Sequence, residues 1–404
     1  MSEHKVKKEK LALVFSGGGS RGAYEMGVWR ALRELGMEPE IVTGTSIGAM
    51  NAALVAQGTF KTGCELWETM ETKMVFDYEH VIENKGVKFT GIKDLLDGKL
   101  VEEDIRKSPV DFGIVTVKFP SMEPVHLWKE EIPEGKLMDY IFASCSCFPV
   151  VAPYEIDGEK YLDGGFADYI PIRQALEKKA DRIVAVDLDG YGKTVGADVA
   201  EAGDRLTMIE SHWDLGNFAV FEPSKAKRLM RLGYLDAMRT FGVFDGRRYA
   251  FIKGEVNQRN IKAAEEAAAD FEVDPRIIYS KEHFVNAVAA AIDEYKAGDD
   301  PDVALLQKNL KRFNIKENKE NKDAPKDKFD LGDLKEFVDS LGSVNRKARL
   351  LLLASLLRRF GYAFPDDTPI EEIKQPPFPL PRPLKKLLGD DLPAAIWLVK
   401  LGLA

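Results

Sequence analysis

Ser46 lies in the segment Gly44-Thr45-Ser46-Ile47-Gly48, where a short apolar run ends and a pattern of small residues begins. This spacing matches G-x-S-x-G, in which a strained turn between strand and helix exposes the serine hydroxyl. A nucleophilic serine also needs a proton acceptor and donors for the charge that develops on the attacked carbonyl. The alternative is an ordinary turn whose serine caps a helix. We therefore take Ser46 as a candidate nucleophile, supported by Gly44 and Gly48.

A second glycine cluster, Ser16-Gly17-Gly18-Gly19-Ser20-Arg21-Gly22, directly follows an apolar run. Gly17-x-Gly19-x-x-Gly22 matches the dinucleotide fingerprint, but no acid ends the next strand about 20 residues on, and no phosphate-binding Gly-Lys-Ser/Thr follows. A nucleotide-binding domain is kept as an alternative. Consecutive glycines can also turn their N–H groups into one cavity, which would form an oxyanion hole. Arg21 either holds this loop in place or contacts an anionic head group, and we favour the first role.

Asp163 is the candidate proton acceptor, in the segment 160-KYLDGGFADYIP-171. It ends a short predicted strand, and Gly164-Gly165 leaves room beside its carboxylate, although an Asp-Gly turn is also a common structural feature. A Ser-His-Asp hydrolase with His212 or His283 would keep a known chain order. Such enzymes place several strands before the nucleophile, whereas this chain has room for two, so we disfavour that alternative.

In this order, the GGGSRG loop, the GTSIG corner and the Asp-Gly-Gly segment resemble the patatin-like phospholipases, which are lipid acyl hydrolases. The resemblance covers about residues 10–190 and extends more weakly to about 300. It implies a Ser46–Asp163 dyad without histidine and an oxyanion hole from Gly17, Gly18 and Gly19. It also implies acyl lipid or ester substrates. The family often has an asparagine shortly after Asp-Gly-Gly, where this chain has Asp168 and Tyr169.

The expected chemistry is ester hydrolysis through an acyl-enzyme, with Asp163 taking the proton of Ser46. A carboxylate is a weak base in water, and burial beside apolar groups would raise its pKa toward the working range. Phe148 and Phe166 are the candidates for this apolar surrounding. No cluster with metal-ligand spacing is present, and neither a metal nor a cofactor is expected.

The elements that must position these motifs follow from the apolar pattern, because apolar runs predict buried strands and helical spacing predicts helices. Their order predicts parallel winding: strand, glycine loop, helix, strand, tight corner, helix. Predicted strands cover 11–15, 40–42, 114–119, 160–162 and 183–188; predicted helices cover 21–35, 47–56, 136–144, 171–179, 224–239 and 281–295. The expected fold class is α/β, with three layers α/β/α around a mostly parallel central sheet and a mainly helical C-terminal region. The glycine loop and the serine corner should then meet at the carboxyl edge of the sheet, where ligands bind.

The composition is that of a globular protein, with 404 residues, 45% apolar and 30% charged. A net charge of −9 argues against a nucleic-acid partner. Residues 1–10 lack a signal-type apolar segment, and no stretch reaches the roughly 18 apolar residues of a membrane span. The cysteines are Cys64, Cys145 and Cys147, an odd and sparse set that fits reduced thiols. We expect a cytoplasmic protein.

The character of the chain changes near residue 300, so we expect an acyl hydrolase domain over 1–300 and a helical region of unknown role over 301–404. The charged segment 308–328 fits a linker or an exposed helix end, and 365–383 is proline-rich. The apolar stretches 344–360 and 384–404 suit peripheral contact with a membrane surface. They equally suit a buried packing helix or a homo-oligomer interface, and we favour these last two.

Overall fold

The computed structural model describes residues 9–76, 90–258, 261–312, 340–359 and 391–403. The chain divides into two compact units, Met1–Phe241 and Gly242–Ala404. This boundary precedes the one expected at residue 300. The reason is that the helix Ile261–Asp270, which lies before residue 300, packs with the C-terminal helices. The assignment of functions to 1–300 and 301–404 stays a prediction.

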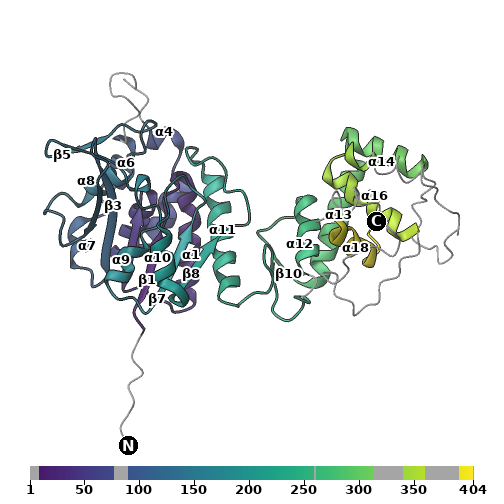
Figure 1. The fold of residues 1–404 in the computed structure, drawn as a ribbon, viewed down its shortest axis with the longest axis horizontal. Coiled ribbons are helices and arrows are strands. Elements are labelled where there is room, and N and C mark those ends of the chain that lie inside the picture. Colours follow the sequence, from purple (N-terminus) through teal and green to yellow (C-terminus); the bar gives the residue numbers. More distant parts are fainter. Residues whose placement is uncertain (1–8, 77–89, 259–260, 313–339, 360–390, 404) are drawn as a thin grey trace, which may run out of the picture. The chain divides into compact units, whose positions relative to one another are not determined.

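The first unit alternates strands and helices around one sheet (Figure 1). Its strands are β1 (Leu11–Phe15), β2 (Ile41–Thr45), β3 (Asp111–Phe119), β4 (Pro124–Trp128), β5 (Tyr154–Ile156), β6 (Glu159–Asp163), β7 (Arg182–Asp187) and β8 (Leu206–Glu210). Its α-helices are α1 (Ala23–Glu34), α2 (Ile47–Gln57), α3 (Phe60–Thr69), α4 (Thr72–Val75), α6 (Thr90–Leu96), α7 (Glu102–Lys107), α8 (Leu137–Ser144), α9 (Ile172–Glu177), α10 (Gly196–Ala202) and α11 (Pro223–Thr240). The short 3-10 helices are η1 (Gly19–Gly22), η2 (Gly164–Phe166) and η3 (Gly203–Arg205).

The central sheet has eight strands in the order β5-β6-β3-β2-β1-β7-β8, with β4 paired to β3. The run β3-β2-β1-β7-β8 is parallel, whereas β4, β5 and β6 join it through antiparallel pairings. All five predicted strands are confirmed, and β4, β5 and β8 are additional. The predicted α/β class is therefore correct, with a parallel centre and an antiparallel edge.

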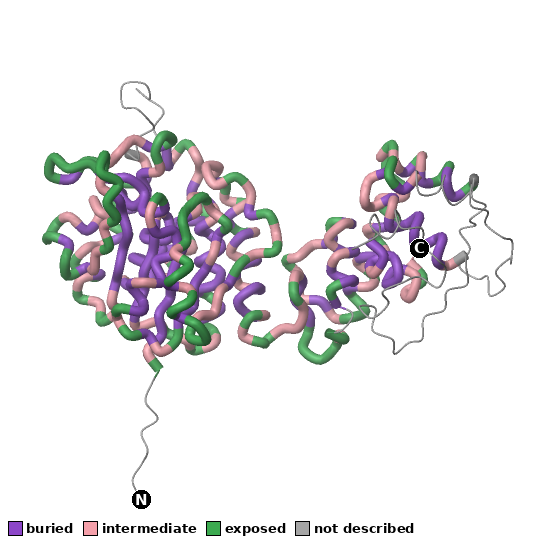
Figure 2. The backbone as a smooth tube through the Cα atoms, in the orientation of Figure 1, coloured by how far each residue is buried: buried purple, intermediate pink, exposed green. Residues whose placement is uncertain are grey.

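Helices cover both faces of this sheet, which makes the strands the buried layer (Figure 2). Side chains along a strand alternate between the faces. In β2, the hydroxyl of Thr43 donates to Pro171 O just before α9, while a side chain at Gly44 would collide with the backbone of α2. In β1, Ala12 and Val14 share a buried cluster with residues of α9. Thus α2 and α9 pack on opposite faces, as expected for three layers.

The helix α2 lies unusually close to the strands that it follows. A Cβ added to Gly48 would lie 2.5 Å from the backbone oxygen of Ser16, and one added to Gly44 would lie 2.2 Å from the oxygen of Gly48. Both positions therefore require glycine, because backbone cannot yield as a flexible side chain can. This close approach fixes the amino end of α2 against the carboxyl ends of β1 and β2.

The second unit is mainly helical, as predicted for the C-terminal region. Its elements are β9 (Ala250–Phe251), α12 (Ile261–Asp270), β10 (Ile278–Tyr279), α13 (Lys281–Ala297), α14 (Pro301–Arg312), α16 (Arg346–Arg359) and α18 (Asp391–Lys400). The apolar residues of α16 and α18 are buried, including Leu350, Leu353 and Ile396. Where the structure describes the two apolar stretches, they are packing helices. Most of 308–328 and all of 365–383 lie outside the described residues.

None of the helices that the structure describes combines the length and the apolar character needed to span a bilayer.

Replacing Gly48 by alanine should destabilise the first unit. Alanine has a better helix propensity by about 1 kcal/mol, but the collision with the Ser16 oxygen should outweigh it, for a net loss of roughly 2 kcal/mol. Denaturant unfolding measures this loss. Gly196→Ala is the matched control, since a Cβ there meets no atom within 4 Å. Equal stability of Gly48→Ala and wild type would contradict the close packing.

Candidate active site

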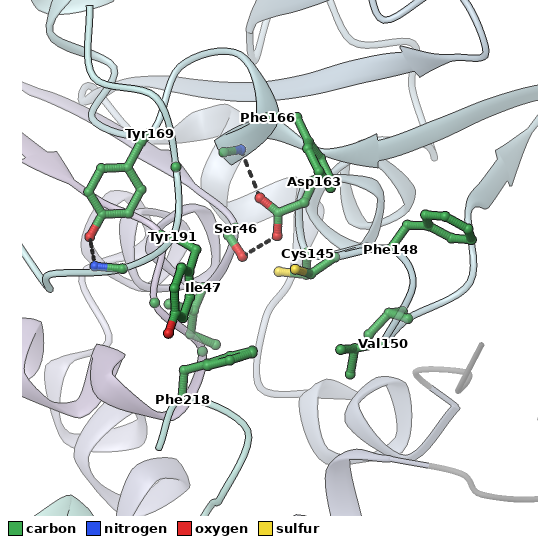
Figure 3. Close-up of a pocket in the computed structure, with 18 of the residues that line it drawn as sticks. Ser46, Ile47, Cys145, Phe148, Val150, Asp163, Phe166, Tyr169, Tyr191 and Phe218 are labelled. Atoms are coloured by element: carbon green, nitrogen blue, oxygen red, sulfur yellow. Dashed lines mark hydrogen bonds between the residues drawn. The ribbon is translucent and has the colours of Figure 1, made fainter. Parts of the chain in front are cut away.

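Ser46 forms the corner between β2 and α2 with a strained backbone, at φ 57° and ψ −129°. A non-glycine residue in such a conformation costs about 1–3 kcal/mol and persists only when its surroundings hold it. Part of this hold comes from Ser144 at the end of α8, whose buried hydroxyl accepts the N–H of Ser46 at 2.8 Å. The strained corner expected from G-x-S-x-G is present, and its hydroxyl points toward Asp163 (Figure 3).

Asp163 reaches Ser46 because of the strand register. Across the sheet, Thr45 pairs with Val115, and the next residue of β3, Thr116, pairs with Asp163 in antiparallel β6. The last residue of β6 therefore arrives beside the residue that follows β2. The hydroxyl of Ser46 donates to Oδ2 of Asp163 at 2.6 Å (Figure 3).

The carboxyl group of Asp163 is buried, with 5% of the residue exposed. Its Oδ1 accepts the N–H of Gly165 at 2.8 Å, and its own N–H donates to Ser146 O at 3.0 Å. Burial raises its pKa to about 6, although the hydrogen bonds from Ser46 and Gly165 act in the opposite direction. The expected rise in the pKa of Asp163 is therefore present, whereas its role as a base stays a prediction.

The glycine loop lies directly against this pair. A Cβ added to Gly17 would lie 3.3 Å from the Cβ of Ser46, so the loop and the corner meet as expected. The N–H of Gly17 donates to Tyr169 O at 3.3 Å. Among the described residues, no backbone acceptor pairs with the N–H groups of Gly18 and Gly19. Gly19 adopts φ 55°, and a Cβ there would lie 2.3 Å from Phe218 O.

Arg21 holds the glycine loop to two neighbouring loops. Its Nε donates to Gly216 O at 2.8 Å, and its guanidinium also donates to the carbonyls of Leu188, at 3.1 Å, and Asp189. Arg21 is not among the residues that line the cavity beside Ser46. These contacts fit the favoured structural role.

The other glycines expected to support the site are close-contact positions. A Cβ on Gly164 would lie 2.4 Å from Val115 O, and one on Gly22 would lie 2.9 Å from the ring of Trp67. The Trp67 ring nitrogen in turn donates to Asn51, a buried residue of α2 that also donates to Gly22 O and to the carboxyl of Glu25. The network ties α2 to the end of the glycine loop.

A cavity of about 710 Å³ opens beside Ser46 and Asp163. Apolar side chains make most of its wall, namely Ile47, Phe76, Ile92, Phe148, Val150, Val151, Phe166, Phe218 and Phe221. Phe148 and Phe166 therefore line the site, as expected. Among the described residues along this wall, Asp163 and the exposed Lys193 are the charged ones.

The histidines that the alternative hydrolase would need lie elsewhere. His212 borders a different cavity with Arg21 and Asp214, and His283 belongs to the second unit, where its ring lies 5.1 Å from that of Tyr279. Among the described residues that line the cavity beside Ser46, there is no histidine.

Asp168 stands where the family often has asparagine, and it is buried. Its backbone oxygen accepts the hydroxyl of Thr45 at 2.8 Å, and its carboxylate bonds Nε2 of His126 at 3.0 Å. The residue thus supports the end of β2 just before Ser46. Neither Asp168 nor Ser144 has a role that its neighbours in the sequence predict. Their partners, Thr45 and the Ser46 N–H, lie far away in the chain, so no local pattern marks them.

Part of the first unit is similar to a known protein family. Residues 13–176 match the family model described as patatin-like phospholipase. The match spans the glycine loop, the serine corner and the Asp-Gly-Gly segment. The second unit lies entirely outside the matched residues.

The relatives that this chain matches are much longer proteins. Patatin-like phospholipase domain-containing protein 7 of Rattus norvegicus is 28% identical over 57% of this chain and 17% of its own length. Lysophospholipase NTE1 of Eremothecium gossypii is 27% identical over 56% of this chain and 15% of its own length. The crystal structure of VipD from Legionella pneumophila aligns with 98% of this chain and 92% of its own, at 13% identity and a TM-score of 0.37. The chain thus spans less than a fifth of the two longer relatives.

The described residues contain no group of three or more histidine, cysteine, aspartate or glutamate side chains arranged to hold a metal ion.

Asp163→Asn should stabilise the protein above pH 6. Because the pKa of Asp163 lies near 6 rather than 3.8, the folded state holds its proton more tightly, and stability from this group falls as the pH rises from 3.8 to 6. Asparagine removes this loss, worth up to about 3 kcal/mol at pH 8, and can keep the hydrogen bonds with Ser46 and Gly165. The difference from wild type should vanish below pH 4.

Denaturant unfolding at pH 4 and pH 8 tests this expectation, with exposed Asp94→Asn as the control that should change little at either pH. An Asp163→Asn variant no more stable than wild type at pH 8 would contradict it.

Proposed function

We propose that this chain hydrolyses acyl esters of amphiphilic lipids, with Ser46 as nucleophile and Asp163 as general base. The observation that carries the proposal is the 2.6 Å hydrogen bond between these side chains, beside a large apolar cavity. A carboxylate with a pKa of about 6 is largely ionised at pH 7 and is a stronger base than an ordinary aspartate. The match of residues 13–176 to a phospholipase family model supports the same reaction.

In the first half of the reaction, Asp163 accepts the hydroxyl proton as Oγ of Ser46 bonds to the acyl carbon. The electron pair of the carbonyl moves to its oxygen, and backbone N–H groups stabilise the charge. We assign this role to Gly18 and Gly19, since the N–H of Gly17 already donates to Tyr169 O. Collapse of the intermediate breaks the ester C–O bond, and the leaving alcohol takes the proton from Asp163.

In the second half, water repeats the sequence on the acyl-serine. Asp163 takes a proton from water as the water oxygen bonds to the acyl carbon. The C–O bond between the acyl carbon and Ser46 then breaks. The serine regains a proton, and a carboxylic acid leaves. Every proton is carried by the same carboxyl group, so the mechanism needs no histidine.

The cavity wall favours a lipid substrate of phospholipase A or lysophospholipase type. Its aromatic and aliphatic residues suit an acyl chain. Lys193, the cation among the described residues of this wall, suits the phosphate of a head group. The name lysophospholipase carried by relatives such as the one from Eremothecium gossypii points the same way. Neutral glycerides would leave Lys193 without a counter-charge.

Ser46→Ala and Asp163→Asn should each lower the hydrolysis of a p-nitrophenyl ester by at least roughly a thousandfold, without loss of folding. A fluorophosphonate should label wild type and not Ser46→Ala. The control is the double variant His212→Ala/His283→Ala, which should keep its activity. Loss of activity in this control would favour the Ser-His-Asp alternative. Tight NAD binding with no fluorophosphonate labelling would favour a nucleotide-binding domain.

Lys193→Gln should lower kcat/KM for a lysophospholipid by roughly tenfold, the value of one hydrogen bond to a charged group. Its kcat/KM for a monoacylglycerol of the same acyl chain should stay unchanged, because this ester lacks the phosphate. Exposed Lys179→Gln, outside the cavity, is the matched control. Equal losses on both esters would remove Lys193 from head-group recognition while leaving the Ser46 chemistry intact.

A further inference from the structure

Exposed large apolar side chains are not spread evenly over the described surface. Eight are exposed, and two of these, Val243 and Ile252, belong to the second unit. Of the other six, four line the cavity beside Ser46 and two belong to the β3–β4 hairpin, and the six are called the rim here. The rim consists of Phe119, Met122, Phe148, Val150, Phe166 and Tyr191.

The rim is continuous with the cavity. Phe148, Val150, Phe166 and Tyr191 line its wall and also face solvent, and Figure 3 shows them around the Ser46–Asp163 pair. Their exposure is large, at 44% for Phe166 and 87% for Tyr191. An apolar surface therefore runs without interruption from the outside of the protein to the nucleophile.

A hairpin extends the rim away from the entrance. The ring of Phe119, at the end of β3, lies 6.4 Å from that of Phe148. Met122 follows in the turn to β4, where its N–H donates to Lys118 O and its side chain is 45% exposed. Neither residue lines the cavity. Their exposure serves no contact with a substrate inside it, so a second purpose must explain the apolar surface.

We propose that the rim docks on the surface of a lipid aggregate, so that an acyl chain passes from that surface into the cavity. Exposed apolar surface next to a ligand cavity marks an interaction site, and aromatic side chains suit a membrane interface. A protein partner seated on the rim would close the entrance to Ser46, whereas a lipid surface supplies the ligand. This inference rests on the proposed function for the identity of that ligand. The proposed site of membrane contact is therefore the rim and not the stretches 344–360 and 384–404, whose described apolar residues are buried.

The test measures binding separately from hydrolysis. The full chain carrying Ser46→Ala is sedimented with phosphatidylcholine vesicles, which it cannot hydrolyse if the proposed function is correct. Adding Phe119→Asp and Met122→Asp should lower the partition coefficient at least roughly tenfold. The matched control adds Val243→Asp and Ile252→Asp, which replace equally exposed residues of the second unit and should change binding less than twofold.

Met122→Asp alone guards against a folding defect, because φ 59° at this turn position is tolerated by aspartate. It should lower the partition coefficient in the same direction. In the wild-type background, the two rim substitutions should leave hydrolysis of a dissolved short-chain ester unchanged. Equal vesicle binding by rim and control variants, or no binding by the Ser46→Ala chain, would overturn the docking proposal. Retained ester hydrolysis by Ser46→Ala would instead overturn the proposed function, whatever the vesicle result.

Discussion

Ser46 keeps a positive φ, and much of the surrounding packing exists to hold that one conformation. The chain must leave β2, expose a hydroxyl and enter α2 within a single residue. Such a sharp corner brings the helix backbone onto the strands, so Gly44 and Gly48 cannot carry side chains. The same crowding applies at Gly17, where a Cβ would press on Ser46. The same steric requirement therefore explains three glycines from two distant motifs. The hydroxyl of Ser144 accepts the N–H of Ser46 at this corner.

Burial raises the pKa of Asp163, which suits the proposed general base, and it also destabilises the charged carboxylate in the folded protein. The carboxyl group has a 2.6 Å hydrogen bond from Ser46 and one from the Gly165 N–H, yet desolvation still dominates and raises its pKa. Among the residues that the structure describes, no cation contributes to this shift. A nearby arginine or lysine would stabilise the carboxylate and lower its basicity. The buried carboxyl of Asp163 thus lowers the stability of the folded protein, as expected at a site where activity and stability conflict.

The sequence predicted the parts of the site that local chemistry encodes. Strands β1 and β2 and helices α1 and α2 follow from apolar spacing, and the positions of Ser46 and Asp163 follow from glycine neighbours that only a tight turn explains. The antiparallel edge was missed because β4 and β5 are short and only partly buried, so neither forms a clear apolar run. The engagement of the Gly17 N–H by Tyr169 O depends on two segments that only the folded sheet brings together. The unit boundary after Phe241 was also missed, since the packing of α12 on α18 leaves no trace in either segment alone.

The part of the apolar rim that lines the cavity is linked to the raised pKa of Asp163, whereas Phe119 and Met122 lie outside the cavity. Phe148 and Phe166 line the cavity into which Asp163 faces, and both also form part of its entrance. A polar entrance would admit water to the carboxylate, lower its pKa and weaken it as a base. Conversely, a lipid surface over the entrance would exclude water further. Exclusion of water would raise the pKa of Asp163 and strengthen the hydrogen bonds that we propose Gly18 and Gly19 donate to the developing charge. An enzyme built in this way would be a stronger catalyst on an aggregate than on a dissolved ester, without any change of fold.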